Sequence, residues 1–372
     1  MKDIFYMKKA INLAKLGKFT TCPNPNVGCV IVKKSKIVGE GWHKKSGEEH
    51  AEIHALKIAK EKSKGATAYI TLEPCCHYGK TPPCCEALFF AGISRVVIAM
   101  KDPNPKVNGI GIFWLKKKGI IVKEGILKNE AEYINQGFLK RMRTGIPWIQ
   151  LKLAMSIDGR TSLQNGKSKW ITSKKSRINV QYFRAKSDAI LSTSKTIFYD
   201  NPSLNVRYHE FNSEKLKKYN INQKKQPIRV IIDSQNRLTP SNKFIHTKGN
   251  IILARLKYDN FIWPKNVKQI LIPSYEKKID LNYLFTKLGK LKINNLWIEA
   301  GPSLSGALLK KKLIDELIIY IAPRLFGQYS NSLCLLDNYS KISKTPKLFF
   351  SNIRKIDSDI RIILKPDDNL YN

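Results

Sequence analysis

The chain has 372 residues, with 66 lysines and arginines against 29 aspartates and glutamates, which gives a formal net charge of +37. This length favours two domains, and the lack of any window of about 18 uncharged apolar residues argues against a membrane-bound protein. The N-terminal stretch MKDIFYMKKAINLAKLGKF is broken by charges, as in an amphipathic helix, whereas a signal peptide would be continuously apolar. We therefore expect a cytoplasmic protein whose seven cysteines stay reduced and serve metal binding or catalysis rather than disulfides.

Strands and helices alternate along the first part of the chain. We expect strands at residues 27–32, 37–42, 66–74 and 95–100, a helix that starts near His50, a helix from Cys84, and a connecting helix over 126–145. Alternation of this kind is typical of a sheet covered by helices. Gly145 and Pro147 then interrupt the chain, so we place the end of the first domain at residue 145.

A second series of strands begins after this boundary. Short apolar runs predict strands at 148–156, 189–194, 228–233, 250–255, 268–273, 294–299 and 316–323. The stretch 208–227 is rich in Asn, Lys and Glu, and we expect a long exposed loop there. The second domain, residues 146–372, is therefore also predicted to be α/β.

The first domain carries a histidine and two cysteines in positions that suit a zinc ion. His50 and Glu52 are two residues apart, so they can serve one site only from the first turn of a helix. Cys75 and Cys84 each follow a proline, Cys75 at a strand end and Cys84 at a helix start. One imidazole and two thiolates leave the fourth zinc position open for water, and Glu52 can shuttle a proton to a leaving amine. This His-x-Glu and Pro-Cys pattern is typical of zinc-dependent base deaminases.

Neighbouring cysteines and histidines leave alternatives open. A structural zinc site would have a fourth protein ligand, which Cys76 or Cys85 could supply. His54 lies four residues after His50 and could imitate a metal pair, but we expect it to be a histidine on the helix face. His77, between the two cysteine pairs, faces either the substrate or solvent.

The motifs PNPNVGCVIV, HAEIHAL, TLEPCCHYGKTPPC and KDPNP resemble the deaminase half of the bifunctional riboflavin biosynthesis deaminase/reductase family of bacteria. The spacer of eight residues between Cys75 and Cys84 is longer than in most cytidine-type deaminases and is similar to that of this family. The resemblance implies a cytidine-deaminase-like α/β/α fold and hydrolytic removal of an amine from a diaminopyrimidine ribosyl phosphate. It also implies that Asn24 reads the pyrimidine edge. Cys76 departs from the family pattern, where a small residue such as serine is expected.

The second domain contains no G-x-G-x-x-G after a strand, so the dinucleotide-binding fingerprint is absent. The stretch LWIEAGPSLSGALL instead runs from a strand into a helix, with Gly301 at the turn and Pro302 in the first helical turn. Free backbone N–H groups at such a junction form an anion site, although a plain strand–helix turn has the same pattern. Glu299 ends an apolar strand, and a carboxylate there should line a cleft.

The motifs QLKLAMSIDGRT, SKWITS, TIFYDNPSLNVR, VIIDS and IEAGPSLSGALL, in this order, resemble the reductase half of the same family. The resemblance thus spans nearly the whole chain, and it implies a dihydrofolate-reductase-like α/β fold that uses NADPH to reduce the ribosyl side chain to ribityl. It assigns to NADPH the positions Ala154, Trp170, Thr196, Asp200, Ser234, Gly301, Pro302, Ser303, Leu304, Ser305, Gly306 and Ala307. It assigns to the substrate Ser168, Arg184, Leu204, Arg207 and Glu299, and the two arginines suit a phosphate.

Together these motifs predict a bifunctional enzyme with Zn²⁺ and NADPH as cofactors and a phosphorylated pyrimidine as its small-molecule substrate. The alternatives are a tRNA or nucleic-acid base deaminase, which the charge of +37 would favour, and a non-catalytic zinc-stabilised nucleic-acid binding protein. Lysines are scattered in short runs without interleaved aromatic residues, and Ile, Asn and Lys are abundant throughout, as in a genome rich in A and T. We therefore expect no nucleic-acid and no membrane partner, while the sequence leaves room for a homo-oligomer.

Overall fold

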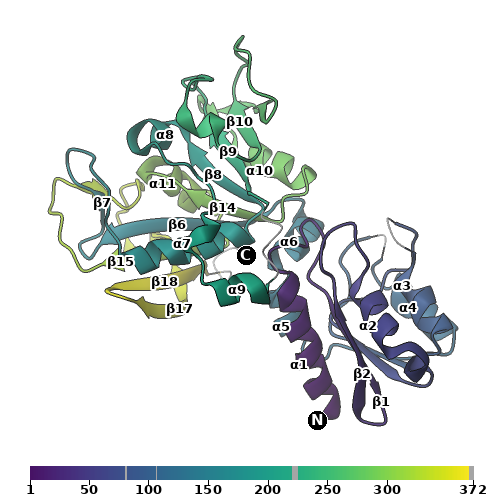
Figure 1. Cartoon of the computed structure of the whole chain (residues 1–372). Helices are drawn as coiled ribbons and strands as arrows, with labels where there is room; N and C mark the ends of the chain where they lie inside the picture. The colour runs from purple at the N-terminus through teal and green to yellow at the C-terminus, as the bar shows by residue number, and fades with distance from the viewer. Residues whose placement is uncertain (80–81, 106, 220–224, 368–372) are drawn as a thin grey trace. The chain divides into compact units, whose positions relative to one another are not determined.

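The structure is a computed structural model and describes residues 1–79, 82–105, 107–219 and 225–367. The chain divides into two compact units, Met1–Gly145 with Asn212–Gln223, and Ile146–Phe211 with Lys224–Asn372. Each unit has its own sheet (Figure 1). Each also has its own hydrophobic core. Among the described residues, no helix combines the length and the apolar character needed to cross a membrane.

The first unit is built on a five-stranded sheet with the order β2-β1-β3-β4-β5. β1 is antiparallel to β2 and β3, whereas β3, β4 and β5 run parallel. The strands are β1 Gly28–Lys33, β2 Lys36–Trp42, β3 Thr67–Ile70, β4 Arg95–Ile98 and β5 Ile121–Glu124. The helices are α1 Lys2–Ala14, α2 Ala51–Ala59, α3 Cys84–Phe90, α4 Ile110–Lys117, α5 Lys128–Tyr133 and α6 Gln136–Thr144.

Helices cover both faces of this sheet. Along β1, Cys29 and Ile31 point to one face and Val30 and Val32 to the other, as the two-residue period of a strand requires. Residues of α2, α3 and α4 pack on the first face, and residues of α1, α5 and α6 pack on the second (Figure 1). The α/β/α fold expected for the deaminase half is therefore confirmed.

Two glycines let α2 lie close against β2. A Cβ atom on Gly39 would clash with the carbonyl oxygen of Ala55, and a Cβ atom on Gly41 would clash with that of Ala51. Neither position has room for a larger residue. This close contact fixes the start of α2, which carries part of the candidate metal site, relative to the sheet.

The structure differs from the expected elements at two places in the first unit. β3 ends at Ile70 rather than at residue 74, and the chain continues to the cysteines as irregular backbone. The single helix expected over 126–145 is two helices, α5 and α6. They separate at Asn135, whose side chain accepts a hydrogen bond from Asn26 N at 2.7 Å and donates one to Asn26 O at 2.9 Å.

The second unit is built on a nine-stranded sheet with the order β11-β10-β9-β8-β14-β6-β15-β18-β17. Its strands run parallel except for the pairs β15–β18 and β17–β18, which are antiparallel. The strands are β6 Trp148–Ser156, β8 Ala189–Thr193, β9 Ile228–Ile232, β10 Ile251–Arg255, β11 Val267–Leu271, β14 Asn295–Glu299, β15 Glu316–Ala322, β17 Leu348–Ile356 and β18 Asp359–Pro366. Two small two-stranded sheets pair β7 Arg160–Ser162 with β16 Asn331–Ser332, and β12 Ser274–Tyr275 with β13 Lys278–Ile279.

Helices cover both faces of this larger sheet as well. Residues of α10 Leu281–Lys290 and α11 Pro302–Lys310 belong to the core on one face, and residues of α7 Lys174–Lys186 and α8 Ser194–Asp200 belong to the core on the other. The parallel strands β6, β8, β9 and β14 end at one edge of the sheet, which is where open α/β sheets bind ligands.

The long exposed loop expected over 208–227 is wrong for the described part of that stretch. Tyr208–Glu210 form a 3₁₀ turn and Ser213–Lys218 form the short helix α9. Tyr208 and Phe211 are buried, and Phe211 stacks on Tyr182 with a ring separation of 4.3 Å. The stretch is polar on average, and this average did not reveal that two of its aromatic residues are buried.

Candidate metal and cofactor sites

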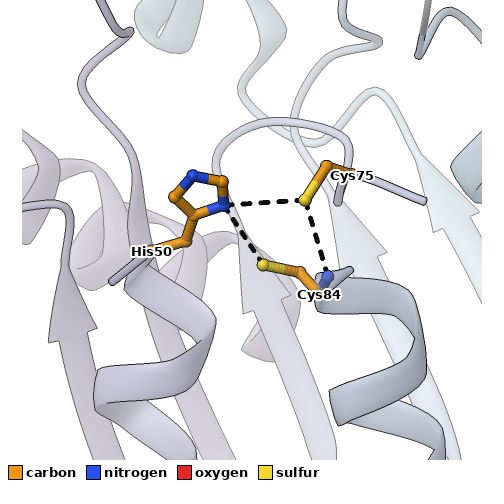
Figure 2. Close-up of side chains that lie close together, drawn as sticks. All are labelled: His50, Cys75 and Cys84. Carbon is orange, nitrogen blue, oxygen red and sulfur yellow. Dashed lines mark hydrogen bonds between the residues drawn. The ribbon is translucent and has the colours of Figure 1, made fainter. Parts of the chain in front are cut away.

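His50, Cys75 and Cys84 come together in the first unit. His50 Nδ1 and the two Sγ atoms all lie within 4.8 Å of one another (Figure 2). His50 is the residue before α2 and Cys84 is the first residue of α3, so two helix starts meet here, and Cys75 reaches the same point from beyond the end of β3. His50 Nδ1 lies 3.3 Å from Cys84 Sγ and 3.6 Å from Cys75 Sγ.

The donor atoms of this cluster are of the kinds that bind a divalent cation. Hydrogen bonds from Cys84 and His50 lower the pKa of Cys75 to about 4, and the bond with Cys75 raises the pKa of His50. A thiolate, a second cysteine sulfur and an imidazole form a donor set that zinc prefers, with the fourth position left for water. His54 lies apart from the cluster, and its Nδ1 is 3.9 Å from a carboxylate oxygen of Glu49.

Glu52 is buried in the first turn of α2 beside this cluster. Burial raises the pKa of Glu52, and its Oε2 atom has no hydrogen-bond partner among the described residues. A buried polar atom without a partner is costly, so Oε2 is available to a ligand or a water molecule in the site. This is the placement expected of a group that moves a proton.

A buried histidine that no sequence motif indicated holds Asn24. His43 Nδ1 lies 3.0 Å from the backbone oxygen of Glu49, so Nδ1 carries the proton and Nε2 accepts a hydrogen bond from the Asn24 amide at 3.1 Å. Burial lowers the pKa of His43 and so favours this neutral ring. His43 also meets His50 edge to face, with ring centroids 5.4 Å apart. The sequence signal is weak, because a histidine directly after a strand is common in many settings.

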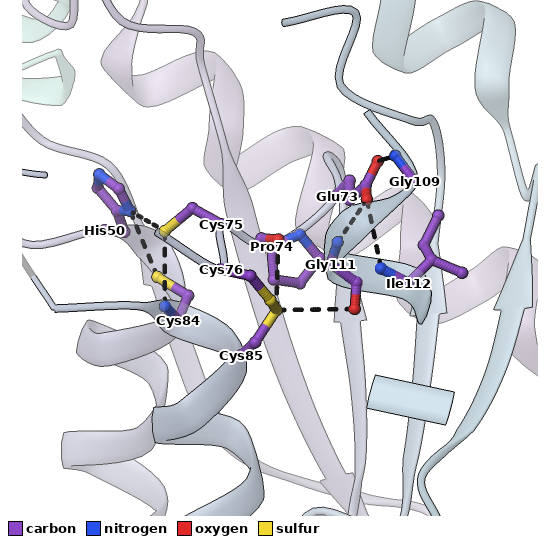
Figure 3. The surroundings of a disulfide bond; sticks show 10 residues. All are labelled: His50, Glu73, Pro74, Cys75, Cys76, Cys84, Cys85, Gly109, Gly111 and Ile112. Atoms are coloured by element: carbon purple, nitrogen blue, oxygen red, sulfur yellow. Dashed lines mark hydrogen bonds between the residues drawn. A yellow bond between two sulfur atoms is a disulfide. The ribbon is translucent and has the colours of Figure 1, made fainter. Parts of the chain in front are cut away.

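A network around Glu73 holds the segment that carries Cys75. The Glu73 carboxylate is buried and accepts a hydrogen bond of 3.2 Å from the backbone N–H of Asp102. It also accepts hydrogen bonds of 3.0 to 3.2 Å from the backbone N–H groups of Gly109, Gly111 and Ile112 (Figure 3). The last three lie at the start of α4, where the helix dipole favours a negative charge. Since Glu73 is two residues before Cys75, this contact fixes the metal-cluster cysteine relative to α4.

Cys76 and Cys85 form a disulfide (Figure 3). The expectation that all seven cysteines stay reduced is therefore wrong for this pair. Consecutive residues of a helix point about 100° apart, so Cys85 turns into the core, where its Sγ contacts the carbonyl oxygens of Pro74 and Gly111. Neither sulfur belongs to the metal cluster, and the disulfide excludes both as a fourth ligand.

The second unit contains a cavity of about 1680 Å³ at the edge where β6, β8, β9 and β14 end. Ten of the twelve positions assigned to NADPH line it, namely Ala154, Trp170, Thr196, Asp200, Ser234, Gly301, Pro302, Ser303, Leu304 and Ala307. All five positions assigned to the substrate line it as well, namely Ser168, Arg184, Leu204, Arg207 and Glu299.

Ser305 and Gly306 are turned away from this cavity. Ser305 is fully buried, and its Oγ donates to Gly301 O at 3.1 Å. A Cβ atom on Gly306 would clash with the carbonyl oxygen of Leu335. These two residues do not line the cavity, and their assignment to NADPH stays a prediction.

The start of α11 lies in the cavity wall. Gly301 is the residue before the helix and Pro302 is its first residue. The N–H groups of a first helical turn have no partner within the helix and lie at its positive end. Both residues line the cavity, so this end of α11 is open to a phosphate group.

An ion pair with little exposure to solvent lines the cavity. Glu299 accepts hydrogen bonds from Arg184 Nε at 2.6 Å, Arg184 Nη2 at 2.9 Å and Trp297 Nε1 at 2.7 Å. Burial raises the pKa of Glu299, but Arg184 outweighs this effect and brings the pKa to about 2. The third nitrogen of Arg184 donates to Asn205 O at 2.9 Å. Arg184 therefore holds Glu299 ionised, in addition to any contact with a substrate phosphate.

Lys152 lines the cavity beside Glu299, and the sequence analysis missed it. The two residues are partners in the register of β6 and β14. Burial lowers the pKa of Lys152, whereas Glu299 opposes this change. In QLKLAM a lysine between apolar residues has the pattern of a strand with one face in solvent. The sequence therefore does not reveal that Lys152 lines a cavity, which only the folded sheet shows.

Further polar contacts involve other residues of the cavity lining. Ser168 Oγ donates to Asp200 Oδ1 at 3.0 Å, which joins a substrate position to a cofactor position. Trp170 is 62% exposed and lines the cavity, so it is available to a ligand rather than part of the core. Arg207 Nε donates to Glu210 at 2.5 Å, an ion pair that the sequence analysis did not foresee.

Comparisons with known proteins agree with these two sites. The model of the RibD C-terminal domain matches residues 147–362, and the model of the cytidine and deoxycytidylate deaminase zinc-binding region matches residues 1–100. The riboflavin biosynthesis protein RibD of Buchnera aphidicola subsp. Baizongia pistaciae is 60% identical over 366 residues, which cover 98% of each chain.

Two solved structures match nearly the whole chain. The RibD structure of Acinetobacter baumannii has a TM-score of 0.88 at 41% identity and covers 98% of this chain and 99% of that one. A diaminohydroxyphosphoribosylaminopyrimidine deaminase/5-amino-6-(5-phosphoribosylamino)uracil reductase from Thermotoga maritima has a TM-score of 0.86 at 30% identity, with the same coverage. The chain belongs to the RibD family of bifunctional riboflavin biosynthesis enzymes, with a zinc-binding deaminase region and an NADPH-using reductase domain.

Proposed function

We propose that residues 1–145 deaminate diaminohydroxyphosphoribosylaminopyrimidine and that residues 146–372 reduce the ribosyl side chain of the product to ribityl. The first step rests on the buried Oε2 of Glu52, which lies beside the His50, Cys75 and Cys84 cluster and has no hydrogen-bond partner in the described part of the chain. The second step rests on the cavity of the second unit and on the ion pair in its wall.

In the deaminase site, His50, Cys75 and Cys84 would hold the zinc ion. Zinc, when bound, supplies the activation of a water molecule for attack on the pyrimidine ring. Glu52 accepts a proton at Oε2 and returns it to the departing amine, a role that suits its raised pKa.

The rest of the deaminase site binds and orients the pyrimidine. The neutral His43 ring fixes the Asn24 side chain, so that the free part of the amide can pair with the pyrimidine edge. His77 is half-buried and its Nδ1 lacks a partner among the residues described, which favours a contact with substrate over a solvent-facing role.

In the reductase site, NADPH, when bound, supplies the hydride that converts ribosyl to ribityl. The start of α11 would hold its phosphates, and Trp170, Thr196 and Asp200 would line its path. Glu299 stays ionised through Arg184 and binds substrate hydroxyl groups. Lys152, whose pKa burial lowers, is placed to donate a proton to the sugar oxygen that is released when the ring opens.

The proposal also concerns location and partners. Phosphorylated pyrimidines cross membranes poorly because they carry charge, so we place the enzyme in the cytoplasm with its substrate. Basic side chains in the cavity suit a phosphorylated substrate and need no nucleic-acid partner. A nucleic-acid deaminase would have no use for the reductase cavity. A homo-oligomer is compatible with both sites, because the residues of each site come from a single unit of one chain.

One experiment tests both steps on the full chain. Purified zinc-loaded enzyme is given the diaminopyrimidine ribosyl phosphate, and ammonia is measured before and after NADPH is added. We expect ammonia without NADPH, and then a loss of absorbance at the nicotinamide band when NADPH is added. Absence of ammonia would contradict the deaminase assignment, and ammonia without NADPH oxidation would contradict the reductase assignment.

A further inference from the structure

The Cys76–Cys85 disulfide lies beside the metal cluster (Figure 3). Each of its cysteines directly follows a proposed zinc ligand, Cys76 after Cys75 and Cys85 after Cys84. Zinc, when bound, would join Cys75 to Cys84, and the disulfide joins the next residue at each end of the same segment. This segment of the chain is therefore closed twice, once by the metal and once by a covalent bond.

The two sulfurs of the disulfide have different surroundings. Cys85 is fully buried in the first turn of α3, and its Sγ contacts the carbonyl oxygens of Pro74 at 3.4 Å and Gly111 at 3.8 Å. Cys76 is half-buried and lies in the irregular backbone between β3 and α3. Cys85 is therefore the fixed partner of the pair, and the disulfide attaches Cys76 to it.

Cys75 is held in the chain from both sides. On one side, Glu73 is bonded to the backbone at the start of α4. On the other side, Cys76 is bonded covalently to Cys85 on α3. The backbone oxygen of Cys75 also accepts a hydrogen bond from Cys85 N at 3.1 Å. Without the disulfide, this single hydrogen bond would be the remaining link from Cys75 to the neighbouring turn of α3.

Reduction of the disulfide changes the position of Cys76. Two thiols that are not bonded to each other keep a van der Waals separation, so their sulfur atoms must move apart. Movement of a side chain in a close-packed core is costly, and Cys85 is in the core. The displacement therefore falls on Cys76 and on Cys75, which is next to it in the chain.

We infer that the Cys76–Cys85 disulfide positions Cys75 for zinc and that its reduction weakens zinc binding, so that the zinc content of the first unit follows the thiol redox state. The inference rests on the proposed zinc site of His50, Cys75 and Cys84. The disulfide is not a ligand and acts only through the position of one. Loss of a group that orients a metal ligand lowers metal affinity by about 10- to 100-fold.

The reducing step is thiol–disulfide exchange with a small thiol such as glutathione. A glutathione thiolate attacks Cys76 Sγ, because Cys76 is half-buried and Cys85 is fully buried, and Cys85 leaves as a thiolate that takes up a proton. A second glutathione thiolate attacks the glutathione sulfur of the mixed disulfide and releases Cys76, which is also protonated. Two glutathione molecules are thereby oxidised to one disulfide, and the protein gains two electrons and two protons.

The test compares the two redox states of the full-length, zinc-loaded protein. One sample is treated with oxidised glutathione and one with reduced glutathione, and both are then freed of glutathione without access to air. Thiols counted in denaturant identify the states, with five expected in the oxidised and seven in the reduced protein. The dissociation constant of zinc, measured by competition with a chelator of known affinity, should be about 10- to 100-fold larger in the reduced protein. Without a chelator both states should keep their zinc, because zinc binding to such sites is much stronger than this loss.

Cys76→Ser cannot form the disulfide, so it should show the weaker affinity after both treatments. Cys334→Ser is the matched control, since Cys334 is a free, half-buried cysteine of the second unit that does not line the cavity. It should keep the difference between the two states that the wild type shows, and thermal unfolding shows whether both variants fold.

Equal zinc affinity in the two states of the wild type would overturn the inference. Tighter binding in the reduced protein would overturn it as well, because Cys76 would then act as a further ligand. The same holds for a difference that persists in Cys76→Ser, or for a wild type that oxidised glutathione leaves with seven thiols. A wild type that binds no zinc in either state would instead overturn the zinc site on which the inference rests.

Discussion

The role of Glu52 distinguishes a catalytic zinc site from a structural one, because a structural zinc site does not need a buried carboxyl group beside its ligands. Glu52→Gln keeps the shape of the side chain but cannot carry a proton. We expect unchanged zinc content, measured by mass spectrometry of the metal, and at least about 100-fold slower ammonia release. Glu61→Gln, in the exposed turn after α2, is the control and should behave as the wild type. Full activity of Glu52→Gln would disprove the proton-transfer role.

The four clustered cysteines are expected to have two roles, with Cys75 and Cys84 as zinc ligands and Cys76 and Cys85 as a disulfide. Cys75→Ser should lose zinc, because it removes a ligand, whereas Cys76→Ser should retain it. Thiols counted in denaturant without reductant give a second measurement. The wild type should show the five free cysteines of the structure, and Cys76→Ser should show six, since Cys85 is released. Seven thiols in the wild type, or zinc loss in Cys76→Ser, would contradict this division.

The metal site could be predicted from the sequence because its signals are local. Histidine and glutamate stand two residues apart, and each cysteine follows a proline. His43 and Lys152 could not be predicted, since their roles come from partners on other segments. The partner of Lys152 is 147 residues away along the chain, on β14. The Arg207–Glu210 pair is local, but an arginine near a glutamate is too common a pattern to indicate a site.

One acid of helix α1 adds polar contacts to three strands of the first unit, beside the apolar packing of the helix. Asp3 accepts hydrogen bonds from Tyr69 on β3, Arg95 on β4 and Lys123 on β5, over 2.8 to 3.0 Å. Arg95 holds the pKa of Asp3 well below its usual value of 3.8. Asp3→Asn should therefore destabilise the first unit by about 2 kcal/mol near neutral pH, measured by thermal or denaturant unfolding.

The same contact predicts a pH dependence. Because the pKa of Asp3 is lower in the folded than in the unfolded state, its stabilising effect is complete above pH 3.8 and is lost as the pH falls through the folded-state value. The gap in stability between the wild type and Asp3→Asn should shrink in acid. Glu130→Gln, at an exposed position of α5, should show no gap at any pH. A gap that stays constant down to acid pH would contradict the assignment.

The order and type of most helices and strands followed from their apolar patterns, but two segments did not. The pattern over 126–145 is continuously helical, and only the contact of Asn135 with Asn26, 109 residues earlier, separates α5 from α6. The segment after Arg207 is polar on average, and average polarity does not reveal that Tyr208 and Phe211 are buried. In both cases the deciding contact is long-range or involves single side chains.

The molecule combines two sites that lie in separate units, and their activities should be separable by mutation. Lys152→Met keeps the length of the side chain and removes its charge. We expect reductase kcat to fall by at least about 100-fold, as for loss of a general acid, while ammonia release stays at the wild-type rate. The measurement follows NADPH oxidation and ammonia on the same preparation.

Lys268→Met is the control for this change, because Lys268 is exposed on β11 of the same sheet and does not line the cavity. Both activities should survive in this variant. If Lys152→Met also lost ammonia release with its fold intact, the two sites would not be independent, and the proposal of two separate reactions in one chain would need revision.

The contact of α2 with β2 at Gly39 and Gly41 has a consequence for how the gene can change. Glycine codons begin with two guanines, and replacement of either by adenine, the change that a genome rich in A and T favours, gives arginine, serine, aspartate or glutamate. Each of these brings a Cβ atom that the carbonyl oxygens of Ala51 and Ala55 exclude. We therefore expect the first two bases of these two codons to stay guanine in a genome rich in A and T, which keeps the position of the helix that carries Glu52.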